Sequence, residues 1–169
     1  GKFTVAVAAL NSPPLTVFSD DNKTLLGSEA DIARLVADSL GLEVNVVPTS
    51  WEDWPLGVAS GKYDAAISNI TVPKERKEKF DFATYRVDSL AFSVKSTSDI
   101  TRISNAQDLS GRKVIVGSGT NQERILLGWN AENETAGRQP ALPVYLTDDA
   151  SGNLYIQSGR ADVFFGPQS

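Results

Sequence analysis

Short apolar runs alternate along the first half of the chain with longer segments whose apolar residues recur at helical spacing. The runs 3–7 and 42–47 are short and rich in valine, which predicts buried strands. Residues 28–40 carry apolar side chains on one helical face, which predicts a helix between these strands. A second helix is predicted at residues 50–60, before another apolar run at 64–68. This alternation of strand and helix is typical of an α/β protein with mostly parallel sheets.

Capping residues predict where these helices begin and end. Ser28 with Asp31 matches a capping box at the start of the first helix, and Gly41 supplies a left-handed stop. Ser50 with Asp53 is expected to cap the second helix, before a proline in its first turn.

One short pattern occurs twice in the chain. Ser60-Gly61-Lys62-Tyr63-Asp64 returns as Ser158-Gly159-Arg160-Ala161-Asp162, and each copy is followed by an apolar run. Each copy predicts a helix that ends at glycine and then a buried strand, which is the repeating unit of a doubly wound sheet. We therefore expect two lobes with a cleft between them, formed by residues 1–92 and 93–169.

Composition excludes several classes of function. The 169 residues include no Cys and no His, so disulfides, zinc sites and Ser-His-Asp triads are not expected, and we predict no metal and no cofactor. A formal net charge of −5 argues against a nucleic-acid partner. No apolar run is long enough to span a bilayer and no leader is present, so we expect that an export signal has been removed.

A polar turn follows the predicted strand at 64–68, at the end of the strand where open α/β sheets bind ligands. This turn, Ser68-Asn69-Ile70-Thr71, is followed closely by Arg76. The planar guanidinium matches a carboxylate better than a lysine ammonium does, so we expect a ligand carboxylate here. The alternative is that residues 74–79 form only a solvated helix face with i,i+4 ion pairs.

The second half contains another candidate anion site. A predicted strand at 113–116 runs into Gly117-Ser118-Gly119-Thr120 and then a predicted helix at 121–129. The N–H groups and the dipole at the start of such a helix favour negative charge. A nucleotide site is disfavoured because Gln122 stands where a third glycine would be needed. The other alternative is a tight turn that only needs glycine for its backbone angles.

The order of these motifs resembles the family 3 extracellular solute-binding proteins, the amino-acid receptors of ABC importers. The resemblance rests on Ser-Gly-Lys-x-Asp, Ser-Asn-x-Thr, Lys-x-Arg and Asp-Phe in the first half, and on Gly-Ser-Gly-Thr-Asn-Gln-Glu and Ser-Gly-Arg-x-Asp in the second. It covers essentially the whole chain. It implies a periplasmic-binding-protein (type II) clamshell, in which two α/β lobes with mostly parallel sheets are joined by hinge strands and close over the ligand.

The resemblance also implies roles for individual residues. Trp51 would pack on the ligand, Arg76 would bind its α-carboxylate, and Thr71 would add a backbone N–H and a hydroxyl to the same group. The remaining positions are Ser68 with a hydroxyl, Asn69 with a backbone carbonyl, Thr120 and Asn121 with helix N-terminal amides, and Gln122 in the pocket lining. For Trp51 the alternative is an aromatic side chain that packs only on its own lobe.

Three departures from the family pattern qualify these roles. Pro167 stands where members usually have an aspartate that accepts the α-ammonium, so the acceptor lies elsewhere or the ligand has no ordinary ammonium. Ser12 replaces an aromatic residue that often covers the ligand, and Phe18 is a candidate substitute. The chain stops at Ser169, about where the second hinge strand should return to the first lobe, so we expect a fragment with an incomplete first lobe.

Together these features predict a non-catalytic periplasmic or extracellular receptor for a small carboxylate, an amino acid or a derivative. Its partners would be the membrane subunits of an ABC transporter. The full-length form is expected to be a monomer. A lipid anchor on the full-length precursor is one way in which it would attach to the membrane. Two alternatives remain on the same fold, a cyclohexadienyl-dehydratase-like enzyme and the sensor domain of a membrane receptor. The enzyme would need a tuned acid or base, whereas Glu52, Asp53 and Glu123 are better explained as helix-start residues.

Overall fold

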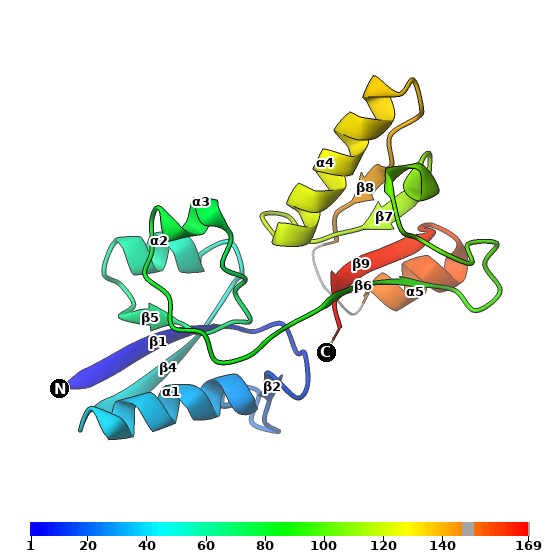
Figure 1. The fold of residues 1–169 in the computed structure, drawn as a ribbon. Helices are drawn as coiled ribbons and strands as arrows, with labels where there is room; N and C mark the ends of the chain where they lie inside the picture. The colour runs from blue at the N-terminus through cyan, green and yellow to red at the C-terminus, as the bar shows by residue number, and fades with distance from the viewer. Residues whose placement is uncertain (147–150, 169) are drawn as a thin grey trace. The chain divides into compact units, whose positions relative to one another are not determined.

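Each half of the sequence forms its own sheet. The computed structural model describes residues 1–146 and 151–168, and the chain divides into two units, Gly1–Arg86 and Val87–Gln168. In each unit helices lie on both sides of the sheet (Figure 1). The two-lobed α/β architecture with mostly parallel sheets is thus as expected, while the lobe boundary between residues 92 and 93 stays a prediction.

The first unit is built around a three-stranded parallel sheet with the order β4-β1-β5. Its elements are β1 (Lys2–Ala8), β2 (Val17–Phe18), β3 (Leu25–Leu26), α1 (Ser28–Ser39), β4 (Glu43–Thr49), α2 (Trp54–Ala59), β5 (Ala65–Ala66) and α3 (Lys74–Lys77). Strand β1 pairs along its whole length with β4, from Lys2 opposite Glu43 to Ala8 opposite Thr49. Helix α1 lies on one face of this sheet and α2 on the other (Figure 1).

The second unit has a four-stranded sheet with the order β6-β9-β7-β8. Its elements are β6 (Leu90–Val94), the 3₁₀ helix η1 (Ala106–Leu109), β7 (Lys113–Ile115), α4 (Asn121–Thr135), β8 (Leu142–Val144), α5 (Ser151–Ser158) and β9 (Val163–Pro167). Strands β7, β8 and β9 are parallel, and β6 pairs antiparallel with β9.

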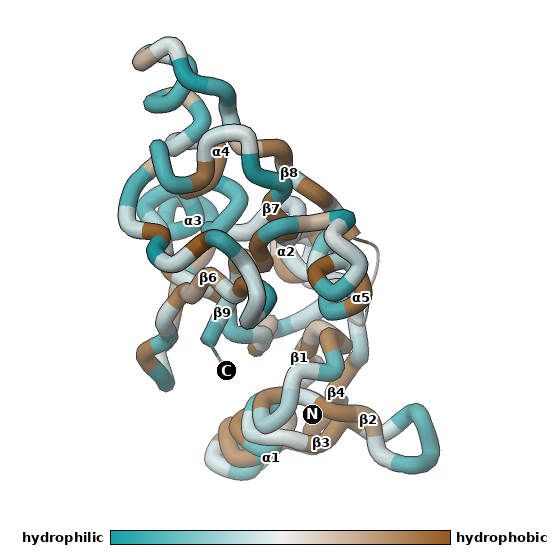
Figure 2. Tube along the Cα trace, turned by 90° about the vertical axis from the view of Figure 1, so that its right-hand side faces the viewer, coloured by the Kyte–Doolittle hydropathy of each residue, from teal (hydrophilic) through white to brown (hydrophobic). Residues whose placement is uncertain are grey.

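Both sheets bury aliphatic side chains between strand and helix. In the first unit Val5 and Val7 of β1 pack against Ala30 and Ala33 of α1, and all four are buried. The second core is larger and includes Phe165, whose ring stacks on Phe92 with centroids 4.1 Å apart. Figure 2 shows the same pattern along the chain, where the strands are largely brown and the loop between β2 and β3 is teal.

The repeated pattern performs the same task in both units. Gly61 and Gly159 both have φ of +75°, which lets the chain leave each helix in the left-handed region. The Asp64 carboxylate then accepts from the Thr4 N–H at 2.7 Å, and the Asp162 carboxylate accepts from the Lys113 N–H at 2.8 Å. Each aspartate, directly before its own strand, therefore binds a backbone N–H of the neighbouring parallel strand.

The predicted capping box at Ser28 is wrong. Helix α1 has Gly27 as its N-cap and no side chain caps it. The N–H groups of Ser28 and Glu29 instead donate to the carbonyls of Pro14 and Leu15. Gly27 itself adopts φ of +113°, and a Cβ there would collide with the Leu15 carbonyl. The preceding loop thus satisfies the helix start, which a local side-chain pattern cannot reveal.

Two predicted boundaries also move. Helix α4 continues to Thr135 rather than ending near residue 129, because Gly128 fits inside the helix and the left-handed stop comes at Gly137. Strand β5 pairs at only two residues, although the Ile67 N–H still donates to the Ala6 carbonyl just beyond it.

Candidate functional site

The turn after β5 is fastened to the end of β1. The buried Ser68 hydroxyl accepts from the Ala8 N–H at 2.6 Å and donates to the Ile67 carbonyl at 2.7 Å. The structure therefore gives this hydroxyl a framework role, different from the ligand contact that the resemblance implies. Asn69, the next residue, has φ of +48° and turns the chain away from the strand.

Arg76 reaches back from α3 to this turn. Its Nη1 donates to the Thr71 carbonyl at 3.0 Å and to the Thr71 hydroxyl at 3.1 Å. Arg76 is half-buried, whereas Lys74, Glu75, Lys77 and the next two residues are exposed. The alternative of a solvated helix face therefore describes the neighbours of Arg76 but not Arg76 itself.

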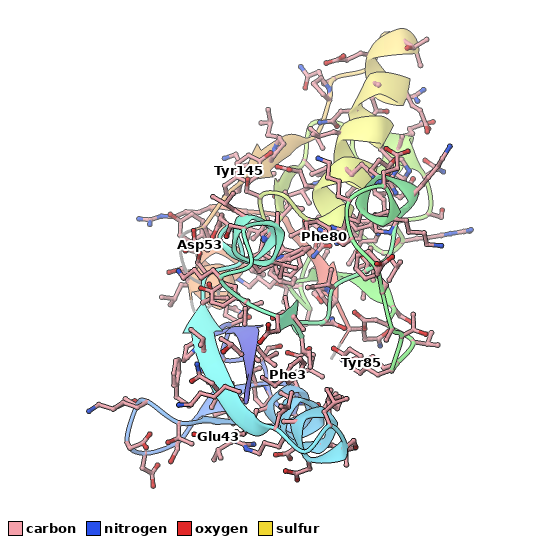
Figure 3. The ribbon with its side chains drawn as sticks, turned by 90° about the vertical axis from the view of Figure 1, so that its left-hand side faces the viewer. Phe3, Glu43, Asp53, Phe80, Tyr85 and Tyr145 are labelled. Carbon is pink, nitrogen blue, oxygen red and sulfur yellow. The ribbon has the colours of Figure 1, made fainter. Side chains whose placement is uncertain are left out.

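Trp51, in the turn before α2, and Trp54, the first residue of α2, lie beside the guanidinium. The Cζ atom of Arg76 lies 5.5 Å from the ring centroid of Trp51 and 5.6 Å from that of Trp54. The two indoles meet edge to face with centroids 6.0 Å apart, and Phe80 packs on Trp54 at 5.4 Å. Trp51 therefore does pack within its own unit, and it does so against the predicted carboxylate-binding residue. Figure 3 labels Asp53 beside α2 and Phe80 on the segment after α3.

Trp54 was not among the site residues predicted from the sequence. It is only 3% exposed, and its indole N–H has no hydrogen-bond partner among residues 1–146 and 151–168. The spacing Trp-x-x-Trp at a helix start was the available signal, because side chains three apart lie on one helical face. Trp54 supplies the inner wall of the Arg76 site.

The electrostatics of this site favour an anion. Burial lowers the pKa of the Arg76 guanidinium, yet arginine stays charged at neutral pH. A cation partly removed from water and held over aromatic faces interacts with a carboxylate more strongly than an exposed lysine does. The contacts to Thr71 and the tryptophans also restrict the direction of the guanidinium fork. In chemical terms, this part of the first unit can bind a small carboxylate.

The glycine loop of the second unit is organised by α4. Thr120 is the N-cap, with a hydroxyl that accepts from the Glu123 N–H at 3.2 Å and donates to the Gly117 carbonyl at 2.7 Å. The Glu123 carboxylate accepts from the Gly119 N–H at 3.0 Å. Glu123 is thus a helix-start partner as expected, and the Thr120 hydroxyl serves the cap.

The other two predicted residues of this loop lie in the first turn of α4. The side-chain Oδ1 of Asn121 accepts from the Arg124 guanidinium at 3.0 Å, and Gln122 is buried. Tyr145 adds a hydrogen bond to Glu123, which is the main reason why its own pKa is raised. The second unit therefore brings Thr120, Asn121 and Gln122 together, and the first unit separately gathers Trp51, Asn69, Thr71 and Arg76.

The structure also locates Phe18, the candidate substitute for the missing aromatic residue at Ser12, and Pro167. Phe18 lies in β2 and packs against the core of the first unit. Pro167 is exposed at the end of β9, opposite Leu90. Within the described ranges, no three acidic side chains form a group that could hold a metal ion. Across those same residues, no helix combines the length and apolar character needed to cross a membrane.

Comparisons with known proteins match this chain to one protein family and to several of its relatives. The sequence profile of the bacterial extracellular solute-binding proteins, family 3, matches residues 4–164. The L-cystine-binding protein TcyJ of Escherichia coli is 39% identical over 115 residues, which are 68% of this chain and 42% of TcyJ. The cyclohexadienyl dehydratase of Pseudomonas aeruginosa is 29% identical over 139 residues, 81% of this chain and 49% of the enzyme. The chain thus spans about half the length of these curated relatives.

A solved structure is similar over the whole fold. The amino acid ABC transporter substrate-binding protein AbpA of Streptococcus pneumoniae, bound to L-arginine, superimposes with a TM-score of 0.84 at 27% identity. The match covers 99% of this chain and 68% of AbpA.

Proposed function

The chain belongs to the bacterial extracellular solute-binding proteins, family 3, and we propose that it binds a small carboxylate, an amino acid or derivative, for an ABC importer. The observation that carries this proposal is the half-buried Arg76, held by Thr71 and flanked by Trp51 and Trp54. Its fork is matched to a carboxylate. The L-cystine named for TcyJ and the L-arginine bound to AbpA both carry such a group.

The other predicted residues have supporting roles in this proposal. Thr71 makes no donated hydroxyl bond within the described part of the chain, so its hydroxyl can donate to the same carboxylate that Arg76 binds. Trp51 would cover the apolar part of the ligand. Amides of Thr120 and Asn121, with Gln122, form the contribution proposed for the second unit. A higher ligand affinity for the closed conformation than for the open one would drive closure.

We propose that the protein is a receptor and not an enzyme. Family members are mainly binding proteins, although one relative of this chain, the cyclohexadienyl dehydratase, is an enzyme. Acid–base catalysis needs a carboxyl or similar group beside the substrate. Glu123 is engaged at the start of α4 by the Gly119 N–H and Tyr145, and Glu52 and Asp53 are exposed beside α2. A receptor function requires none of them.

The proposed setting follows from the family description as extracellular proteins. Attachment by a lipid anchor and a monomeric state belong to this proposal, as do the membrane subunits of the importer as partners. A sensor domain of a membrane receptor would use the same ligand contacts.

A ligand screen tests the proposal. Thermal shift would be measured with the twenty common L-amino acids and L-cystine, each paired with an analogue in which the carboxylate is removed or amidated. Binding to the native state raises the melting temperature. We expect at least one acid to stabilise the protein, and its analogue without the carboxylate to fail. Two results would remove the basis for the proposal. One is equal stabilisation by the acid and its analogue in every pair, and the other is no stabilisation by any compound.

A further inference from the structure

A carboxylate lies buried beside the candidate ligand turn. Glu29, in the first turn of α1, is only 2% exposed. Burying an ionisable group without partners is costly, so a buried carboxylate calls for specific hydrogen bonds. Asp31 and Arg34 on the same helix pair with each other at 2.8 Å. The partners of Glu29 come from elsewhere in the first unit.

These partners connect three segments. The Tyr85 hydroxyl donates to a Glu29 carboxylate oxygen at 2.9 Å, and the Asn69 backbone N–H donates to the Tyr85 oxygen at 3.2 Å. Tyr85 belongs to the segment that follows α3, where Figure 3 labels it, and Asn69 belongs to the turn after β5. The relay therefore joins α1, the segment after α3 and the candidate ligand turn.

The direction of the relay depends on the charge of Glu29. An ionised carboxylate only accepts hydrogen bonds, so it fixes the Tyr85 proton toward itself and leaves the phenolic oxygen to accept from Asn69. A protonated carboxyl could donate to that same oxygen and compete with the Asn69 N–H. In the ionised relay the Asn69 N–H keeps its acceptor, and Asn69 has a left-handed φ of +48°.

We propose that Glu29 and Tyr85 are positioning residues for the ligand turn, which hold Asn69 and thereby Thr71 in the arrangement that binds the ligand. This inference rests on the proposed function for its ligand, but the relay itself can be measured without one. Neither residue was a sequence-based candidate, because their roles depend on contacts between segments far apart in the chain.

The titration of Glu29 provides an independent observable. Burial raises its pKa, while the hydrogen bond from Tyr85, the nearby backbone N–H of Asn69 and the positive charge of Arg86 oppose this rise. Tyr85 and Arg86 are the titratable groups that face Glu29 from the segment after α3, and burial with the nearby Glu29 raises the pKa of Tyr85 as well. Because the folded-state pKa of Glu29 is raised, ionising it costs stability as pH rises through that range.

The test follows the Asn69 amide by NMR in the ligand-free protein. In wild type we expect the chemical shift of the Asn69 amide to titrate at a pH above the ordinary range for Glu, and its hydrogen exchange to be slow. Glu29→Gln should abolish this titration. Tyr85→Phe should speed the exchange of the Asn69 amide by about fivefold or more, because it removes roughly one hydrogen bond. Tyr155→Phe in the second unit is the matched control and should change neither signal.

Binding is measured in parallel by calorimetry with L-arginine and L-cystine as probes. We expect Tyr85→Phe and Glu29→Gln each to weaken binding of a probe by about fivefold, and the double variant to lose less than the product. An unchanged Asn69 amide in both variants would overturn the inference. A changed Asn69 amide signal with unchanged affinity for the probes would also overturn it. If Arg76→Lys weakened binding in that case, the proposed function would still stand. If wild type binds neither probe nor any acid of the ligand screen, the proposed function fails and the ligand role of the relay fails with it.

Discussion

The Nη1 nitrogen of Arg76 donates to both the carbonyl and the hydroxyl oxygen of Thr71. This pair of hydrogen bonds ties the short helix α3 to the turn that follows β5. Helix α3 is only one turn long and has no buried residue, so it could not hold the guanidinium by its own packing. Contacts with Thr71 and the two tryptophans therefore contribute to the direction of Arg76.

Arg76→Lys should weaken carboxylate binding by about 2 kcal/mol or more. Lysine keeps the charge but replaces a planar fork by a compact, strongly hydrated ammonium. Lys77→Ala on the same helix removes an exposed charge and should change affinity by less than about 0.5 kcal/mol. Calorimetric titration with the best ligand of the screen compares the two. Equal affinity for wild type and Arg76→Lys would rule out Arg76 as the carboxylate site.

Gly57→Ala and Gly128→Ala should change stability in opposite directions, although both glycines lie in helices. A Cβ at Gly57 would overlap the ring of Tyr63, which is buried and cannot swing into solvent. We expect a loss of about 2 kcal/mol or more from this overpacking. Nothing lies within 4 Å of a Cβ at Gly128, so alanine there should gain about 0.5–1 kcal/mol. Urea unfolding measures both, and a stable Gly57→Ala would show that Tyr63 packs differently.

Asp64→Ala and Asp162→Ala should have parallel effects. Each removes a carboxylate that accepts from a backbone N–H of a neighbouring strand. A loss of about 1 kcal/mol is expected for each, and the two losses should add because the sites lie in different units. The free energy of unfolding of the single and double variants checks this. A negligible effect of one variant would mean that the two copies of the pattern are not structurally equivalent.

Pro167→Asp should shift ligand preference toward free α-amino acids. Proline at the end of β9 offers no side-chain acceptor for an ammonium, whereas an aspartate there would pair with it. We expect the affinity ratio of L-arginine over its Nα-acetyl analogue to rise about tenfold, within the range for one charge-assisted bond. An unchanged ratio, measured by calorimetry, would indicate that another group already accepts the ammonium.

The sequence predicted those parts of the fold that depend on local patterns. Apolar runs located β1 and β4, and the repeated Ser-Gly-x-x-Asp pattern correctly indicated two similar units. The start of α1 could not be predicted in the same way. Its first N–H groups donate to carbonyls of the loop around Leu15, so the cap is formed by backbone groups distant in sequence.

The same distinction applies to the site. Arg76 could be singled out because an arginine after a polar turn has a recognisable chemistry, and its contact with Thr71 lies nearby in the chain. Trp54 and Glu29 were missed, since their importance comes from burial and from partners on other elements. Ser68 lies in the turn after β5, but whether its hydroxyl faces a ligand or the end of β1 depends on the register of two strands.

The central claim, that Arg76 binds the carboxylate of a small ligand, is tested most directly by NMR of the Arg76 side chain. Its Nε–H signal would be followed while the protein is titrated with L-arginine or L-cystine, and in parallel with agmatine or cystamine, which lack the carboxylates. We predict that at least one of the two acids shifts the Arg76 signal and that its decarboxylated analogue does not. Binding of an acid that leaves this signal unchanged, or equal shifts with acid and amine, would contradict it.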